Sequence, residues 1–153
     1  MSIQERIKQH RYRNSTEESF VSLLFTGNHM LQRIEEVCQA HGITHTQYNV
    51  LRILRGVHPE GHPRCEIAER LITRAPDVTR LLDRLEQQKL IVRSWSKENR
   101  RHSIARITPK GLALLLTIDP AIEVLEKETT GRLTAAEQKA LVHFCDRMAA
   151  GEK

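Results

Sequence analysis

The residues best suited to chemistry lie on one predicted helix face near the middle of the chain. Arg80 and Arg84 are one helical turn apart, so both guanidinium groups are expected to project from the same side of a helix. Thr79 falls on that side as well, while the apolar residues between them fall on the opposite side. Guanidinium and hydroxyl groups can hydrogen-bond to base edges in the major groove of DNA. The pattern therefore predicts a helix that buries one face and presents the other to a nucleic acid.

The residues just before this face form the predicted tip of the same helix. Pro76 is of a type tolerated at the first helical position, and we expect Arg74 and Asp77 to lie beside it. The N–H groups at such a helix start favour a phosphate. The competing interpretation is a solvated face, on which the arginines form ion pairs with Asp77 and Asp83, since exposed pairs are common and weak.

A second basic group follows in a polar loop. Lys97, Arg100 and Arg101 lie within residues 94–102, between apolar stretches at 90–92 and 103–108 that predict a β-hairpin. A hairpin tip can enter a minor groove, where a narrow groove attracts arginine. The alternative is a charge run that only aids solubility. Because the helix face and the loop occur together, at the spacing of a helix-turn-helix and its wing, we favour DNA binding.

The charge distribution agrees with this interpretation. The 153 residues carry a net charge of +5, and residues 64–110 alone carry +6, from 12 basic and six acidic side chains. The remainder of the chain has a net charge of −1. A balance this uneven indicates a polyanionic partner for the central third.

The elements that position these residues are predicted from apolar spacing and capping signals. After a polar, frayed lead-in over residues 1–13, we expect helices at 14–41, 44–56, 65–72 and 76–89, with a loop at 58–63 between the second and third. The second of these helices opens at a capping box formed by Thr44 and Gln47. Two strands form the hairpin, and further helices follow at 109–128, interrupted or kinked by Pro120, and from a capping box at Thr134 onward. The fold class is mainly α with a small β-hairpin wing.

The first long helix is awkward to bury within so small a protein, since about 27 residues make a rod of roughly 40 Å. Part of its apolar face is expected to meet another chain. We therefore divide the chain into residues 1–42, an N-terminal dimerisation helix with its lead-in, 43–110, a winged helix-turn-helix region, and 111–153, C-terminal dimerisation helices, all in one integrated domain.

Histidine and cysteine residues offer a weaker signal for metal. Two sets have ligand-like spacing: Cys38, His41 and His45, and His58, His62 and Cys65. Neither set has four ligands, so we expect no metal and no cofactor. The chain also lacks a nucleophile–base pair or a glycine-rich phosphate loop, which argues against the rival interpretation of a helical enzyme or metalloprotein.

Other features bear on the compartment. Three cysteines are too few for a disulfide framework, and no apolar run approaches the ~18 residues of a membrane span. We expect a cytoplasmic protein with no membrane partner and reduced thiols. Cys38 and Cys145 fall on apolar faces. Trp95 at the start of the wing could contact DNA or cover the core, and we favour the second role.

Several motifs together resemble the MarR family of transcriptional regulators. The segments that carry the resemblance are Ile43–Leu51 (ITHTQYNVL), Cys65–Leu71 (CEIAERL), Val78–Glu86 (VTRLLDRLE), Leu90–Arg93 (LIVR), Asn99–Arg101 (NRR) and Ile107–Gly111 (ITPKG). The likeness covers about residues 15–149. It departs from the family at Asn99, where an aspartate usually braces a wing arginine; Glu98 is a candidate substitute.

The resemblance implies a homodimer that binds a pseudo-palindromic operator in double-stranded DNA, usually as a repressor. It also implies release by a small effector, often an aromatic or phenolic acid, although some relatives respond to oxidation or metal instead. By analogy, the effector site would involve His29, Tyr48, Asn49 and Arg52. Their alternative role is hydrogen bonding between helices or protomers.

Overall fold

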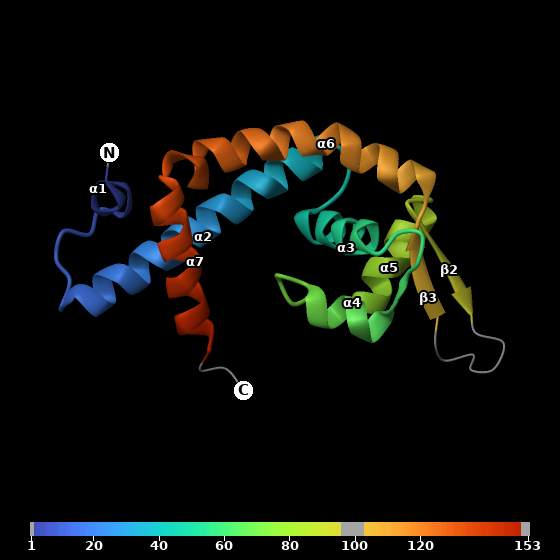
Figure 1. The fold of residues 1–153 in the computed structure, drawn as a ribbon, viewed down its shortest axis with the longest axis horizontal. Coiled ribbons are helices and arrows are strands. Elements are labelled where there is room, and N and C mark those ends of the chain that lie inside the picture. The colour runs from blue at the N-terminus through green and yellow to red at the C-terminus, as the bar shows by residue number, and fades with distance from the viewer. Residues whose placement is uncertain (1, 96–102, 151–153) are drawn as a thin grey trace.

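The computed structural model describes residues 2–95 and 103–150, which form a mainly helical chain with one small sheet (Figure 1). This confirms the predicted fold class. The elements in chain order are α1 (Ile3–Ile7), α2 (Ser15–Ala40), α3 (His45–Gly56), β1 (His62–Pro63), α4 (Arg64–Arg70), α5 (Val78–Gln87), β2 (Ile91–Trp95), β3 (Ser103–Ile107), α6 (Pro109–Glu128), the 3-10 turn η1 (Thr130–Arg132) and α7 (Ala135–Ala149). In Figure 1, α3, α4, α5 and the strands gather at one end, and α7 and the start of α2 lie at the other. Helix α6 runs from the strands to α7, and α2, α6 and α7 together form a long arm.

The sheet holds the compact end together. Its strand order is β1-β3-β2, with all neighbours antiparallel, and Ile91 pairs with Ile107 across β2 and β3. Strand β1 pairs His62 with Ala105 of β3. A Cβ atom on Gly61 would collide with the Ala105 carbonyl oxygen, so this close approach requires glycine.

The core of this end is formed by aliphatic side chains from the three short helices and the sheet. Leu51, Leu54, Ile67, Leu82 and Leu85 are all at most 1% exposed. Each fully buried side chain of this size contributes about 1.5–3 kcal/mol to the free energy of folding. The core therefore fixes the face that α5 turns inward and, with it, the face left to solvent.

The arm is anchored to this core by α6. Leu115, Ile118 and Ile122 of α6 and Cys38 of α2 belong to the same buried cluster. Ion pairs of 2.6 Å join Arg33 of α2 to Glu128, and Arg55 of α3 to Asp119. The far part of the arm is not packed on this core, because every residue of α7 is exposed.

Three predicted elements were wrong in detail. Residues 1–13 are not wholly frayed, because Ser2 and Glu5 form a capping box that starts α1. The predicted loop at 58–63 ends in β1, a two-residue strand with no sequence signal of its own. Pro76 is not the first helical residue, since the side chain of Asp77 caps α5 by accepting a hydrogen bond from the Arg80 backbone N–H at 2.9 Å.

Pro120 does not interrupt the helix that contains it. It lies within α6, which is continuous from Pro109 to Glu128. A proline removes the hydrogen bond to the carbonyl group four residues earlier, that of Leu116. Both Pro120 and Leu116 are exposed, so water can reach this side of α6, while the buried Ile118 and Ile122 hold the helix on the core.

One prediction of burial was also wrong. Trp95 is 59% exposed at the end of β2 and does not cover the core. Cys145 is exposed on α7, whereas Cys38 is fully buried as expected. The division of the chain at residues 42 and 110 stays a prediction.

Candidate nucleic-acid interface

The outer face of α5 carries the polar side chains that the sequence singled out. Thr79, Arg80 and Arg84 are exposed, while Val78 and Leu82 are buried against the core. The amphipathic pattern predicted for this helix is thus the one observed. Two arginines one turn apart therefore point to solvent from the same rigid helix.

These arginines are not neutralised by the acidic residues beside them. Across residues 2–95 and 103–150, neither Arg80 nor Arg84 forms an ion pair. The Asp77 carboxylate instead caps the helix, and Asp83 pairs with Arg93 of β2. The interpretation of a face made neutral by local ion pairs is therefore not supported.

Arg93 joins the strand β2 to the same helix. Its Nη2 donates to Asp83 Oδ1 and Glu86 Oε2, both at 2.6 Å, and its Nε donates to Glu86 Oε2 at 3.0 Å. The Arg93 backbone N–H also donates to Glu86 Oε1 at 3.0 Å. Hydrogen bonds to Glu86 and Asp83 outweigh partial burial and raise the pKa of Arg93, so the guanidinium stays charged.

This cluster determines how the hairpin is oriented on α5, and sequence reasoning missed it. The available signal was two carboxylates three residues apart on a helix, followed by an arginine after the turn. That pattern is indistinguishable in sequence from an ordinary exposed ion pair.

The segment before α5 places the remaining predicted contacts on the surface. Arg74, Pro76 and Asp77 are exposed, in the turn between α4 and α5. The turn is held from α3, because Asn49 Oδ1 accepts a hydrogen bond from the Ile72 backbone N–H at 2.9 Å.

The wing tip lies outside the described residues. This applies to the predicted contacts Lys97, Arg100 and Arg101 and to the departure at Asn99. The strands that lead into the tip are described, and on their surface Arg106 Nη1 donates to Ser94 Oγ at 2.5 Å.

A small cavity lies between α2, α3 and the turn before α5. It has a volume of about 50 Å³, room for only one or two water molecules. The predicted effector residues Tyr48, Asn49 and Arg52 line it, and the Arg52 guanidinium lies 5.8 Å from the centre of the Tyr48 ring. His29 is not in its wall and stacks on Phe25 of α2 instead. The other lining residues are Leu31, Ile34, His45, Thr46, Ile72 and Thr73.

The thiols and the candidate metal ligands are not gathered into a site. In the part of the chain that the structure describes, no three histidine, cysteine or acidic side chains come together as metal ligands would. Burial, with the nearby Glu35 carboxylate, raises the pKa of the Cys38 thiol to about 12. None of the described helices is long and apolar enough to cross a membrane.

Comparison with known proteins agrees with this geometry. The model of the MarR family matches residues 43–103, which span α3 to the start of β3. The transcriptional regulator MhqR of Bacillus subtilis (strain 168) is 32% identical over 109 residues, covering 66% of this chain and 71% of MhqR. A crystal structure of a MarR transcription factor from Planctomyces limnophilus is 36% identical, with a TM-score of 0.70 over 89% of this chain and 98% of that one.

The fold is also that of a protein crystallised with DNA. Sco3205, a MarR family regulator from Streptomyces coelicolor, has a TM-score of 0.80 over 93% of this chain and 91% of its own in a DNA complex. At 22% identity this likeness concerns the fold. Relatives that are transcriptional regulators argue against an enzyme.

Proposed function

This chain belongs to the MarR family of DNA-binding transcriptional regulators, and we propose that it is a homodimeric, sequence-specific repressor that a small effector releases from its operator. The observation that carries the proposal is the outer face of α5. Its two exposed arginines are without ion pairs among the described residues, and their helix is fixed by a buried core and by the Arg93 cluster.

The DNA contacts follow from which groups are exposed. We assign Arg80, Arg84 and Thr79 to base edges in the major groove, where arginine donates paired hydrogen bonds. We assign Arg74, with the backbone near Pro76 and Asp77, to phosphates at the entrance of the groove. In the wing, Lys97, Arg100 and Arg101 would contact the adjacent minor groove.

The homodimer is supported by apolar surface that the single chain leaves uncovered. A groove of about 760 Å³ runs between α2 and α7. The apolar residues that line it are Phe20, Leu23, Leu141, Phe144 and Met148. Contiguous apolar surface of this kind marks an interaction site. A two-fold dimer would present two α5 helices to half-sites about one helical turn apart.

The effector would enter the cavity lined by Tyr48, Asn49 and Arg52. An aromatic or phenolic acid fits these groups, since Arg52 can bind the acid and the Tyr48 ring can contact an aromatic face. A pocket for such a ligand occupies ~300 Å³ or more, far above the present volume of about 50 Å³. Binding would therefore have to separate α2 from α3, which would move the DNA-binding region.

The test begins with selection of binding sites from random DNA. Arg80→Ala and Arg84→Ala should each lower affinity for the selected site by ~1–3 kcal/mol, or roughly 5- to 150-fold, and reduce discrimination between sites. Arg101→Ala should weaken binding evenly across sequences and flatten its salt dependence. Arg132→Ala, which removes an exposed positive charge in η1, is the matched control. Wild-type affinity and discrimination in both α5 variants would refute the proposed surface.

The dimer is tested separately by sedimentation equilibrium. Phe144→Glu places a charge in the groove, so we expect the variant to be a monomer where the wild-type protein is a dimer. Val92→Glu changes an apolar residue that is similarly exposed, on β2 outside the groove, and should leave the dimer intact. A wild-type protein that is monomeric at micromolar concentration would contradict the homodimer.

A further inference from the structure

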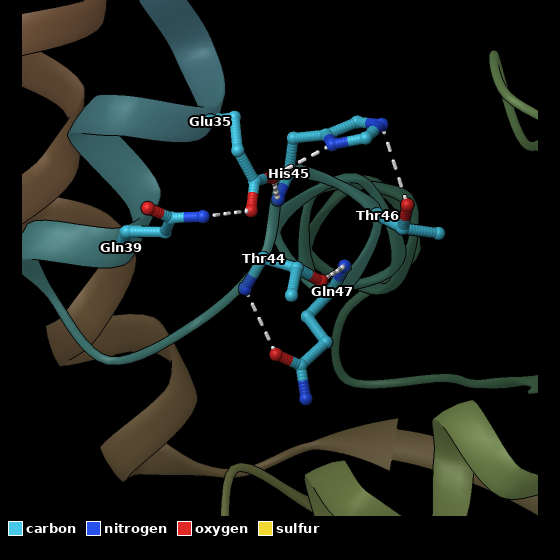
Figure 2. A network of polar contacts seen from close by, with 6 residues as sticks. All are labelled: Glu35, Gln39, Thr44, His45, Thr46 and Gln47. Carbon is cyan, nitrogen blue, oxygen red and sulfur yellow. Dashed lines mark hydrogen bonds and ion pairs between the residues drawn. The ribbon is translucent and has the colours of Figure 1, made fainter. Parts of the chain in front are cut away.

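A compact polar cluster joins the long arm to the DNA-binding end of the molecule (Figure 2). Glu35 of α2 is its centre. Glu35 Oε2 accepts hydrogen bonds from the backbone N–H and from the ring Nδ1 of His45, both at 2.7 Å. Glu35 Oε1 accepts a third, from Gln39 Nε2 at 2.8 Å. His45 is the first residue of α3, so this carboxylate links the side of one helix to the start of the next.

The start of α3 is therefore capped by two different segments. The first N–H groups of a helix have no partner within that helix. Thr44 and Gln47 satisfy one another in a capping box, with Gln47 N donating to Thr44 Oγ1 at 3.2 Å and Thr44 N donating to Gln47 Oε1 at 2.9 Å. This local box was predicted from sequence. The His45 N–H instead donates to the Glu35 carboxylate of α2. The negative charge of this carboxylate also interacts favourably with the positive end of the α3 helix dipole.

Glu35 is suited to this role because it stays ionised. Burial alone would raise the pKa of its carboxyl group. The hydrogen bonds from the His45 backbone, the His45 ring and Gln39 outweigh that effect and hold the pKa below its ordinary value. Hydrogen bonds to an ionised acceptor are shorter and stronger than neutral ones.

From α3 the connection continues to α5, the helix that we propose to read the major groove and therefore call the recognition helix. One turn after His45, the Asn49 side chain holds the Ile72 backbone N–H in the turn before α5. Between the two, Tyr48 is buried and packs α3 on the core. The loop between α2 and α3 turns at Gly42 with φ +76°, and Ile43, which follows it, is buried in the core. The bonds at Glu35 are thus one of the links that set the position of α5 relative to α2, beside the buried cluster and the ion pairs of α6.

We propose that Glu35 is a positioning residue, which through His45 sets the separation of the two recognition helices and thus the operator spacing that the dimer accepts. The inference rests on the proposed homodimeric function. Each protomer carries one such link, so a shift at Glu35 would act on both half-sites in opposite directions along the DNA.

The experiment compares operators that differ only in half-site spacing. Affinities are measured for the selected operator and for versions lengthened or shortened by one base pair. In Glu35→Ala we expect affinity for the selected spacing to fall about tenfold, equivalent to about 1.4 kcal/mol, and the preference over the altered spacings to shrink by a similar factor. Glu35→Gln should retain part of the preference, because its amide oxygen can still accept from the His45 N–H.

The matched control is Glu36→Ala, which removes the same charge from an exposed position next along α2. A loss of stability would lower the active fraction of the protein and weaken the apparent affinity for all operators equally. The ratio of affinities between spacings therefore distinguishes an effect on positioning from an effect on folding. If Glu35→Ala does not fold, His45→Leu removes the ring contacts with Glu35 and Thr46 but keeps the backbone hydrogen bond to Glu35. It should therefore reduce the spacing preference, but less than the alanine variant would.

Two results would overturn the inference. The first concerns a wild-type protein that prefers the selected half-site spacing. If folded, dimeric Glu35 and His45 variants show the same ratio of affinities between spacings, the positioning role is refuted and the proposed function stays intact. A wild-type protein that selects no operator would refute the proposed function, and the inference with it.

Discussion

The Arg93 cluster makes a sharp prediction about how the wing is attached to α5. Replacing Arg93 by methionine keeps most of the apolar stem but removes the guanidinium group that binds Asp83 and Glu86. The two carboxylates then lose their shared counter-charge on the helix that we propose to face DNA. Both the stability of the fold and the affinity for DNA should fall.

The size of the effect follows from the exposure of the three side chains. Hydrogen bonds to charged groups contribute about 1.5–3 kcal/mol when well protected from water. Here Arg93 is only 14% exposed, but Asp83 and Glu86 are 46% and 39% exposed, so water can replace part of what is lost. We expect a decrease of about 1–2 kcal/mol in the free energy of unfolding, which corresponds to roughly 3–7 °C in Tm at fixed protein concentration.

The assay pairs thermal unfolding with operator binding, and Arg106→Met is the control. Arg106 lies on β3, and its guanidinium donates to Ser94 Oγ, so its loss removes the same formal charge from the same hairpin. We expect Arg93→Met to weaken operator binding about tenfold more than Arg106→Met, because only the first exposes uncompensated carboxylates to phosphate. Equal losses of Tm and of affinity in the two variants would refute the reasoning.

Three further predictions concern a thiol, a carboxylate and a glycine. At pH 8 a thiol reagent should label Cys65 in the native protein but Cys38 only after denaturation, because burial raises the Cys38 pKa to about 12; equal rates would contradict the burial. Burial raises the pKa of Glu35, but its hydrogen bonds outweigh burial and lower the pKa below its ordinary value, so its stabilisation is present above the ordinary pKa and lost as pH falls through the folded pKa. Urea titrations of Glu35→Gln should show a stability deficit at pH 7 that disappears in acid, and a constant deficit would argue against the ionised form. Gly111→Ala should cost about 1–3 kcal/mol in urea unfolding, since its Cβ would collide with a backbone carbonyl, whereas Gly56→Ala has open space and should be near neutral or stabilising.

The recognition helix was predictable because its signals are short in range. The spacing of Val78, Leu82 and Leu85 indicated the buried face, and Arg80 and Arg84 followed on the opposite one. The capping boxes at Thr44 and Thr134 were confirmed for the same reason, since each involves residues three positions apart.

The partners of the charged groups were not predictable in this way. Asp83 could pair in sequence with several nearby arginines, and only the packing of β2 against α5 brings Arg93 to it. Glu35 and His45 are separated by a helix end and a glycine turn, so nothing local indicates their contact. Likewise, His29 shares α2 with the cavity wall but does not line the cavity.

Periodicity, caps and charge are local properties, so the sequence alone predicted every helix after α1, the inward face of α5 and a basic central third of the chain. The tertiary structure decided which surface remains free to meet DNA and which charges are already committed to one another. It also decided that Phe20, Phe144 and Met148 are left exposed on a groove. The physical reason is that exposure and ion pairing depend on the distance between segments far apart in the chain, which only the packed core establishes.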